Sequence, residues 1–237
     1  MTTLVLDLKS VPDPAVGKRL LALEQFGDAE AVLAMKTLRV AGHQSPVVPL
    51  QQRRVVAAAL VIAAPERFEI REFAAGSDEG ALLASVEALA RDKAVPVWAW
   101  DGGRHYRPQL LARALALKLA LPSLFSAQGP LSVAAHFGFH PGEAPLGELA
   151  AVHGLPHRLG LRTAETEQAH ARGETAKLVG GSAVDALLAY LLSIALKAAT
   201  GEMAEPERQA AHQQVCRWLD EQTASHWQQF RKVWKAL

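Results

Sequence analysis

Cysteine, aromatic residues and an excess of either charge are all scarce in this sequence. Its 237 residues include one cysteine, Cys216, so no disulfide can form within the chain. No Cys/His cluster has the spacing of a zinc finger, and we therefore expect a reducing, cytoplasmic environment. Aromatic residues amount to 6% and hydrophobic residues to 50% of the chain. This composition favours a helix-rich globular protein over a β-sandwich or a disordered chain.

Long apolar runs and basic stretches are also missing. The longest apolar stretch, residues 183–196, is interrupted by Asp185 and is shorter than the roughly 20 residues that span a bilayer. The first residues have no basic segment followed by a long apolar one, so we expect neither secretion nor a membrane span. Lys and Arg number 25 against 24 Asp and Glu, a net charge of +1. The chain as a whole therefore neither strongly attracts nor strongly repels nucleic acid.

Hydrophobic periodicity predicts alternating strands and helices in the first half of the chain. The predicted strands cover residues 3–8, 53–64, 67–73 and 95–100, and the predicted helices cover 16–35, a segment beginning at 77, and 108–119. The strands on either side of Pro65 form a hairpin. Further helices are predicted at 145–153, 182–200 and 207–237. We expect a single domain over residues 1–237, with an insertion at about 13–52 and a helical C-terminal extension at about 203–237.

Two helix starts are predicted from capping residues. Ser77 precedes Asp78 and Glu79, and acidic side chains stabilise the first turn of a helix. Glycines 180 and 181 predict a break before the next helix, with Ser182 as its N-cap and Asp185 in its first turn. On this interpretation Asp185 stabilises a helix end and needs no further role.

Five segments together resemble one family. They are TLVLDLKSVPD at the start, QQRRVVAAALVI, PVWAWDGGRHYRPQLLARAL, PLGELAAVHGLP and AVDALLAYLL, in this order. The chain resembles the predicted 3'-5' exonucleases related to the proofreading domain of B-family DNA polymerases, which are DEDD exonucleases. The resemblance implies an α/β fold, a ribonuclease H-like mixed sheet flanked by helices, with a helical C-terminal part.

The resemblance also implies a two-metal site, and this sequence departs from it. The family holds two divalent cations with four carboxylates, so that one ion activates water and the other stabilises the leaving oxygen. Asp7 and Asp185 match two of these carboxylates, but Lys9 stands in place of a Glu and Tyr106 in place of an Asp. Gly181 stands where the family has a Tyr that orients the attacking water.

These departures change the charge that is available to hold metal ions. Asp7 and Asp185 supply −2 and Lys9 supplies +1, whereas two Mg²⁺ bring +4. We therefore expect Lys9 to form an ion pair with Asp7, Asp185 or both, in the volume that the metals would occupy. No cofactor is expected for such a site. An active enzyme would need Mg²⁺ or Mn²⁺, with Asp101 as a substitute ligand and His105 as an additional one; as an alternative, Asp101 belongs to an ordinary Asp-Gly-Gly turn.

Candidate contacts to single-stranded DNA or RNA lie in two places. Four arginines are expected to flank the cleft: Arg53, Arg54, Arg104 and Arg107. In the C-terminal segment, Trp227, Phe230 and Trp234 alternate with basic residues, a pattern that suits base stacking but is also the packing stripe of an amphipathic helix. We favour core packing for these aromatic residues.

The sequence leaves three functions open. The first is a catalytically degenerate exonuclease-like protein that binds single-stranded nucleic acid or a protein partner. The second is an active metal-dependent 3'-5' exonuclease that uses Asp7, Asp185 and Asp101. The third is a structural or assembly protein on an exonuclease fold. No membrane partner is expected, and the oligomeric state is left open.

Overall fold

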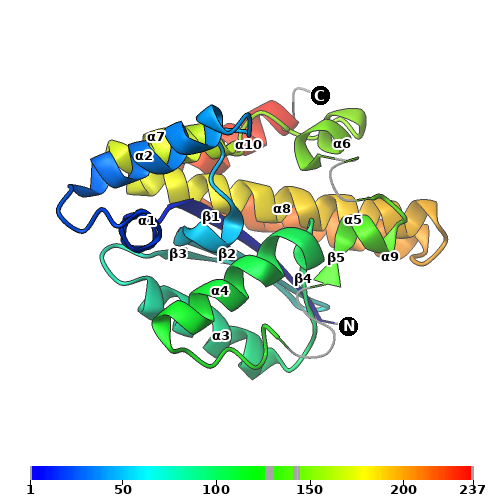
Figure 1. The fold of residues 1–237 in the computed structure, drawn as a ribbon. Helices are drawn as coiled ribbons and strands as arrows, with labels where there is room; N and C mark the ends of the chain where they lie inside the picture. The colour runs from blue at the N-terminus through cyan, green and yellow to red at the C-terminus, as the bar shows by residue number, and fades with distance from the viewer. Residues whose placement is uncertain (1, 126–130, 141–142, 144, 236–237) are drawn as a thin grey trace.

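The computed structural model shows one mixed sheet with helices on both faces (Figure 1). It describes residues 2–125, 131–140, 143 and 145–235, except for the side chains at positions 103 and 104. The strands are β1 (Thr3–Pro12), β2 (Arg53–Ala64), β3 (Arg67–Ala74), β4 (Val97–Ala99) and β5 (Leu131–Ser132), in the order β3-β2-β1-β4-β5. β2 runs antiparallel to β1 and β3, and β4 runs parallel to β1 and β5. The predicted α/β fold, a mixed sheet flanked by helices with a helical C-terminal part, is confirmed.

The central strand β1 presents its side chains alternately to two layers of helices. Its leucines at positions 4, 6 and 8 join the core cluster that includes residues of α3 (Glu79–Lys93) and α4 (Arg107–Leu117). Val5 joins the core on the opposite face, with residues of α8 (Thr175–Ala199). Because side chains alternate along a strand, Asp7 and Lys9 point to the same face as Val5. Both charged residues are thereby directed toward α8.

The long helix α8 crosses this second face of the sheet (Figure 1). It is long and apolar enough to cross a membrane by length and composition, yet 83% of its most apolar window is buried within the protein. The helices α9 (Glu205–Glu221) and α10 (Ser225–Trp234) pack on it. α8 is therefore a core helix of this domain, and its burial accounts for its hydrophobicity.

The segment between β1 and β2 contains two helices and a short turn. α1 (Pro14–Leu21) begins after Asp13, whose carboxylate accepts a hydrogen bond from the Ala15 N–H at 3.0 Å. α2 (Asp28–Ala41) starts after Gly27, so the single helix predicted over 16–35 is two helices, and the second extends past residue 35. The 3-10 turn η1 (Leu50–Gln52) leads into β2. The predicted hairpin of β2 and β3 is confirmed.

The remaining short helices connect the sheet to α8. They are the π-helical turn η2 (Gly102–Tyr106), α5 (Val133–His136), α6 (Leu146–Val152) and α7 (Thr163–Ala171). α4 begins directly after η2, so Tyr106 is the last residue before a helix that packs on the sheet. The predicted helices in this part of the chain are present, although their ends differ by a few residues.

Two predicted helix starts are wrong. Asp78, not Ser77, caps α3, because its carboxylate accepts a hydrogen bond from the Ala81 N–H at 2.9 Å. α8 begins at Thr175 and runs through residues 180–182, so Ser182 is inside the helix and is not its N-cap. The two glycines allow close packing: a Cβ at Gly180 would lie 2.9 Å from the His226 ring, and one at Gly181 would lie 2.5 Å from the Leu161 side chain.

Candidate functional site

β1 and α8 bring three charged side chains together where they cross. Asp7 and Lys9 lie two residues apart on the same face of β1, and Asp185 projects from the facing side of α8. Ser182 lies one helical turn before Asp185, so both point toward β1. We call Asp7, Lys9 and Asp185 the Lys9 cluster.

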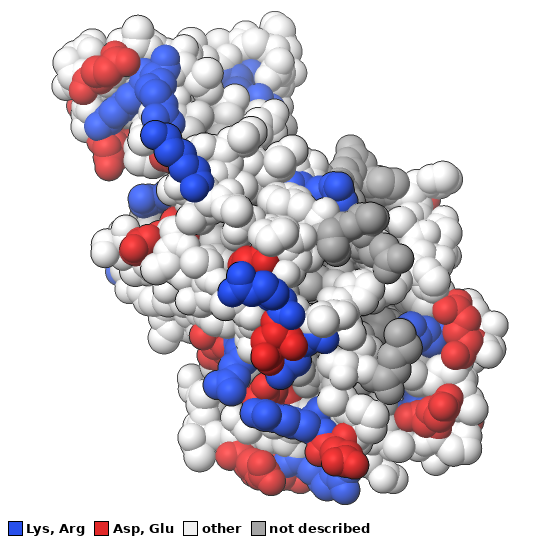
Figure 2. All heavy atoms as spheres, turned by 90° about the horizontal axis from the view of Figure 1, so that it is seen from below, with Lys and Arg blue, Asp and Glu red and all other residues white. Residues whose placement is uncertain are grey.

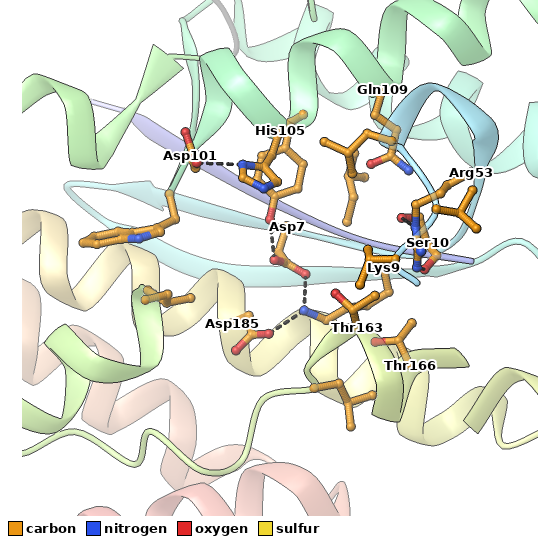
Figure 3. Close-up of a pocket in the computed structure, with 18 of the residues that line it drawn as sticks. Asp7, Lys9, Ser10, Arg53, Asp101, His105, Gln109, Thr163, Thr166 and Asp185 are labelled. Atoms are coloured by element: carbon orange, nitrogen blue, oxygen red, sulfur yellow. Dashed lines mark hydrogen bonds and ion pairs between the residues drawn. The ribbon is translucent and has the colours of Figure 1, made fainter. Parts of the chain in front are cut away.

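The Lys9 ammonium lies between the two carboxylates (Figure 3). Its Nζ is 3.0 Å from Asp7 Oδ2 and donates a hydrogen bond to Asp185 Oδ2. The side chains of Lys9, Asp7 and Asp185 are 8%, 7% and 15% exposed. The expected ion pair is therefore formed with both aspartates, and it is largely removed from water.

Asp7 has two further hydrogen-bond donors. The Tyr106 hydroxyl donates to Asp7 Oδ1 at 2.7 Å, and the Ser182 hydroxyl donates to Asp7 Oδ2 at 2.9 Å. Both carboxylate oxygens of Asp7 are thus engaged by side chains of this chain. The role of Ser182 was missed by the sequence interpretation, which placed it at a helix end. Its spacing of three residues from Asp185 was the signal that both share one helix face.

Burial and the attraction between opposite charges shift the pKa values of Lys9 and Asp185 in opposite directions. Removal from water alone lowers the pKa of Lys9, but the carboxylates of Asp185 and Asp7 outweigh it and raise the pKa above its ordinary value. Burial, and the Asp7 charge after it, raise the pKa of Tyr106 well above its ordinary value. Burial also raises the pKa of Asp185 to about 6, and the attraction of Lys9 offsets this only in part. At neutral pH, Lys9 is therefore a cation and Tyr106 a neutral donor.

Two neighbouring residues fill the space around Asp185 and α8. Gly160 packs against the carboxylate so closely that a Cβ there would lie 1.8 Å from Asp185 Oδ1. The Leu161 side chain lies against Gly181, the position at which the family resemblance places a Tyr. A hydrocarbon side chain thus occupies the space beside Gly181, and it has no hydroxyl with which to orient a water.

The Lys9 cluster lies in the wall of a pocket of about 540 Å³, which we call the Asp7 pocket. Its walls come from β1, η1 and the residues before it, the start of β2, η2 and the residues before it, α4, and the helices α6, α7 and α8. Apolar side chains form much of the lining, among them Val47, Val48, Leu50, Trp100, Leu146 and Leu161.

Asp101 and His105 lie at the edge of this pocket and bind each other. His105 Nδ1 is 2.6 Å from Asp101 Oδ2, across one turn of η2. In Figure 3 the Asp101 carboxylate lies beside His105, apart from the Lys9 cluster. The structure therefore pairs the two proposed substitute ligands with one another, and no described hydrogen bond joins either to Asp7 or Asp185.

The arginines expected to contact phosphate differ in their surroundings where the structure describes their side chains. Arg53 lines the pocket, but it is 2% exposed and donates to Glu167 Oε1 at 2.7 Å and to Ser10 Oγ at 3.1 Å. Arg54 does not line the Asp7 pocket, and its Nη2 lies 3.2 Å from His170 Nε2. Arg107 is exposed at the start of α4, and the side chain of Arg104 lies outside the described part. A phosphate would therefore compete with Glu167 and Ser10 for Arg53 and with His170 for Arg54, and phosphate contact by these arginines stays a prediction.

The donor set of this site does not fit two divalent cations. Asp7 accepts hydrogen bonds at both oxygens, and the Lys9 ammonium lies between the two aspartates that would have to share the metals. Tyr106, where the resemblance implies a third carboxylate, is a hydrogen-bond donor. Among the residues that the structure describes, no group of three or more His, Cys, Asp and Glu side chains is placed to hold a metal ion.

The C-terminal part of the chain matches the model of one protein family. This family is described as predicted 3'-5' exonucleases related to the exonuclease domain of PolB, and the match covers residues 131–234. The predicted resemblance is confirmed over this region, which contains Asp185 and Gly181. Asp7, Lys9 and Tyr106 lie outside it.

A solved structure is also similar to this chain. It is the family B DNA polymerase from the hyperthermophilic archaeon Pyrobaculum calidifontis, with 13% sequence identity and a TM-score of 0.49. The similarity covers 89% of this chain and 27% of the polymerase, so the chain spans about a quarter of that protein. No curated protein sequence matches the chain.

Proposed function

We propose that this chain is a catalytically degenerate 3'-5' exonuclease-like protein that does not hydrolyse phosphodiester bonds. The observation that carries the proposal is the Lys9 ammonium, which lies 3.0 Å from Asp7 Oδ2 and donates to Asp185. Two-metal hydrolysis needs these carboxylates as ligands, and the ammonium competes for the same oxygens. With all three groups charged, the cluster carries a net charge of −1. Two divalent cations bring +4, so the cluster would neutralise only a small part of their charge.

Electrostatic repulsion supports the same proposal. A divalent cation about 4 Å from the Lys9 ammonium would be repelled by roughly 8 kcal/mol at an effective dielectric constant of 20. Moving the ammonium away would remove this repulsion, but it would break both buried ion pairs. The active alternative therefore requires a different rotamer of Lys9 as well as a new ligand from Asp101, which is hydrogen-bonded to His105.

A protein without this chemistry would act through what it binds, and nucleic acid has limited support among the described residues. Lys and Arg alternate with Asp and Glu over the face that carries α3 and α4 (Figure 2), so this face has no continuous basic surface. Trp227 and Phe230 are buried and cannot stack with bases. We therefore measure the binding of single-stranded DNA or RNA with the strands of the hydrolysis assay. A protein partner is the alternative.

The test is a hydrolysis assay on 3'-labelled single-stranded DNA and RNA with Mg²⁺ or Mn²⁺. We expect no shortening of either strand by the wild-type protein. Shortening that disappears in both Asp7→Ala and Asp101→Asn would overturn the proposal in favour of the active alternative. Binding of the same strands in EDTA at increasing salt measures nucleic-acid affinity separately, because phosphate contacts weaken as salt rises.

The double variant Lys9→Glu with Tyr106→Asp tests the metal positions directly, and Lys235→Glu is its matched control. It restores the carboxylates at the two divergent positions, so we expect Mn²⁺ affinity above that of the wild type in a calorimetric titration. Lys235→Glu makes one of these charge changes on an exposed residue outside the cluster and should leave Mn²⁺ binding unchanged. Equal binding by the double variant and the wild type would show that Lys9 and Tyr106 do not stand at metal-ligand positions.

A further inference from the structure

The Asp7 pocket has the size and lining of a small-molecule site. Its volume of about 540 Å³ lies within the roughly 300–1,000 Å³ of ligand pockets in proteins. Residues 47–50, from the segment between β1 and β2, form an apolar wall together with Trp100 and Leu161. Such a lining favours a ligand with an apolar or aromatic body.

The charged residues of the pocket do not favour an anion. Lys9 and Arg53 are the Lys and Arg residues among the described lining, and both are paired with carboxylates: Lys9 with Asp7 and Asp185, and Arg53 with Glu167. Asp101 adds a further carboxylate at the edge. A phosphate or carboxylate would therefore enter without an unpaired lysine or arginine to receive it, and close to several negative charges.

One buried side-chain nitrogen in the pocket has no hydrogen-bond partner among the described residues. Gln109 projects from α4 into the pocket (Figure 3) and is 3% exposed. Its Nε2 makes no hydrogen bond within the described structure. Buried amide groups are rarely left unpaired in proteins, because removal from water costs free energy that a hydrogen bond must offset. A carboxamide offers both donors and an acceptor, so its natural complement is a group that also has both.

Two hydroxyl groups extend this polar side of the pocket. Thr163 and Thr166 line it from α7, and Thr166 is buried. Hydroxyl groups, like the carboxamide, are uncharged and can both donate and accept. The polar groups that are not already held in ion pairs are thus neutral.

We propose that the Asp7 pocket binds a small uncharged organic molecule with an apolar ring and a carboxamide or lactam group, which pairs with Gln109. The inference rests on the proposed function, because metal ions and a substrate phosphate would occupy the same space. In the bound state the ring lies against the apolar wall that residues 47–50 help to form. The amide group of the ligand exchanges hydrogen bonds with the Gln109 carboxamide.

The experiment compares three probes of similar shape on the full chain in EDTA: benzamide, benzoate and phenyl phosphate. Ligand-observed NMR titration should show saturable benzamide binding, with benzoate and phenyl phosphate at least about tenfold weaker. Gln109→Leu should weaken benzamide binding by about tenfold, because the ligand amide is then left unpaired. Gln228→Leu, on the exposed side of α10, is the matched control and should bind as the wild type does.

A second variant covers the case in which Gln109→Leu does not fold. Leu50→Trp enlarges a side chain in the apolar wall and should abolish benzamide binding while a circular dichroism spectrum shows the native fold. No saturable benzamide binding by the wild type, equal binding of benzamide and benzoate, or unchanged binding by Gln109→Leu would each overturn the inference. These readouts are independent of nuclease activity, so strand shortening in Mn²⁺ would overturn the proposed function, whereas absence of benzamide binding would overturn this inference alone.

Discussion

Lys9 sets the charge of the site, because its ammonium lies between two buried aspartates. The ammonium balances one of the two buried aspartates and leaves the other in excess. The two carboxylates raise the pKa of Lys9 despite its burial. Burial raises the pKa of Asp185, the Asp7 charge adds to this shift, and the attraction of Lys9 offsets it only in part. Asp185 therefore takes up a proton as the pH falls through about 6.

The pH dependence of stability tests this assignment. In the folded state the pKa of Asp185 is about 6, against an ordinary value of 3.8, so the folded protein binds the proton more tightly than the unfolded chain does. The resulting contribution to stability is fully present below about pH 4 and is lost as the pH rises through 6. We expect the free energy of unfolding of the wild type, relative to Asp185→Asn, to increase by about 3 kcal/mol at most between pH 7 and pH 4.

Urea denaturation at several pH values measures this difference. The Asn variant cannot titrate at this position, so other titrating groups largely cancel in the comparison. A stability of the wild type, relative to the variant, that falls toward pH 4 would mean that the folded-state pKa of Asp185 lies below its ordinary value, contrary to the assignment.

The contacts between residues of the site were predictable from the sequence only in part. The position of Lys9 between Asp7 and Asp185 followed from charge, because an ammonium attracts the two aspartates that the resemblance brings to one site. The hydrogen bonds from Tyr106 and Ser182 to Asp7 did not follow, because they depend on how η2 and α8 are placed against β1. No local sequence pattern predicts how η2 and α8 pack against β1.

At the scale of elements, close packing between a loop and α8 holds the Lys9 cluster in place. Gly160 lies directly before Leu161, and both contact α8: Gly160 at Asp185, and Leu161 at Gly181. This explains the failure of the predicted helix break at residues 180–182. Two adjacent glycines usually weaken a helix, but here the tertiary packing requires their lack of a side chain, and the sequence alone does not show which neighbour lies there.

Substitution of Gly160 tests this packing. Gly160 has no positive φ, so alanine is acceptable to the backbone, but its Cβ would lie 1.8 Å from Asp185 Oδ1. We expect Gly160→Ala to lower the free energy of unfolding by about 2–3 kcal/mol, because Asp185 must move away from Lys9 or the loop must shift. Thermal and urea unfolding measure the change.

Gly147→Ala is the matched control for this substitution. Gly147 lies in the first turn of α6, where a Cβ would be 3.5 Å from the His157 carbonyl oxygen, an ordinary contact. We expect a change within about 0.5 kcal/mol or a small stabilisation, since alanine favours a helix more than glycine does. Equal effects of the two substitutions would show that the contact with Asp185 carries no special cost.

At the scale of the whole molecule, the sheet separates two hydrophobic cores. One lies between the sheet and α3 and α4, and the other between the sheet and α8, α9 and α10. This arrangement was largely predictable, because strand alternation and helical periodicity fix which side chains are buried. The closure of the Asp7 pocket by residues 47–50 was not, since this segment has no hydrophobic periodicity and its position depends on the two helices before it.

The C-terminal aromatic residues show how the second core extends to the end of the chain. Trp227 packs edge-on against Trp218 with ring centroids 4.9 Å apart, and Phe230 and Trp234 are 5.6 Å apart. The expectation of core packing is confirmed for Trp227 and Phe230, which are buried, and Trp234 is half-buried. α10 is thereby an integral part of the domain, joined to α8 and α9.

Phe230→Ala distinguishes this packing from a stacking surface for bases. Because the Phe230 ring is fully buried, its removal should lower the free energy of unfolding by about 3–5 kcal/mol, through lost burial and the cavity left behind. Leu115→Ala, at a position that is 74% exposed on α4, should change it by less than about 0.5 kcal/mol. Urea unfolding of both variants, together with single-strand binding at low salt, separates the two roles. A variant Phe230→Ala that kept its stability but lost affinity for single strands would place this ring on a binding surface, because a base can stack only on a ring that it can reach.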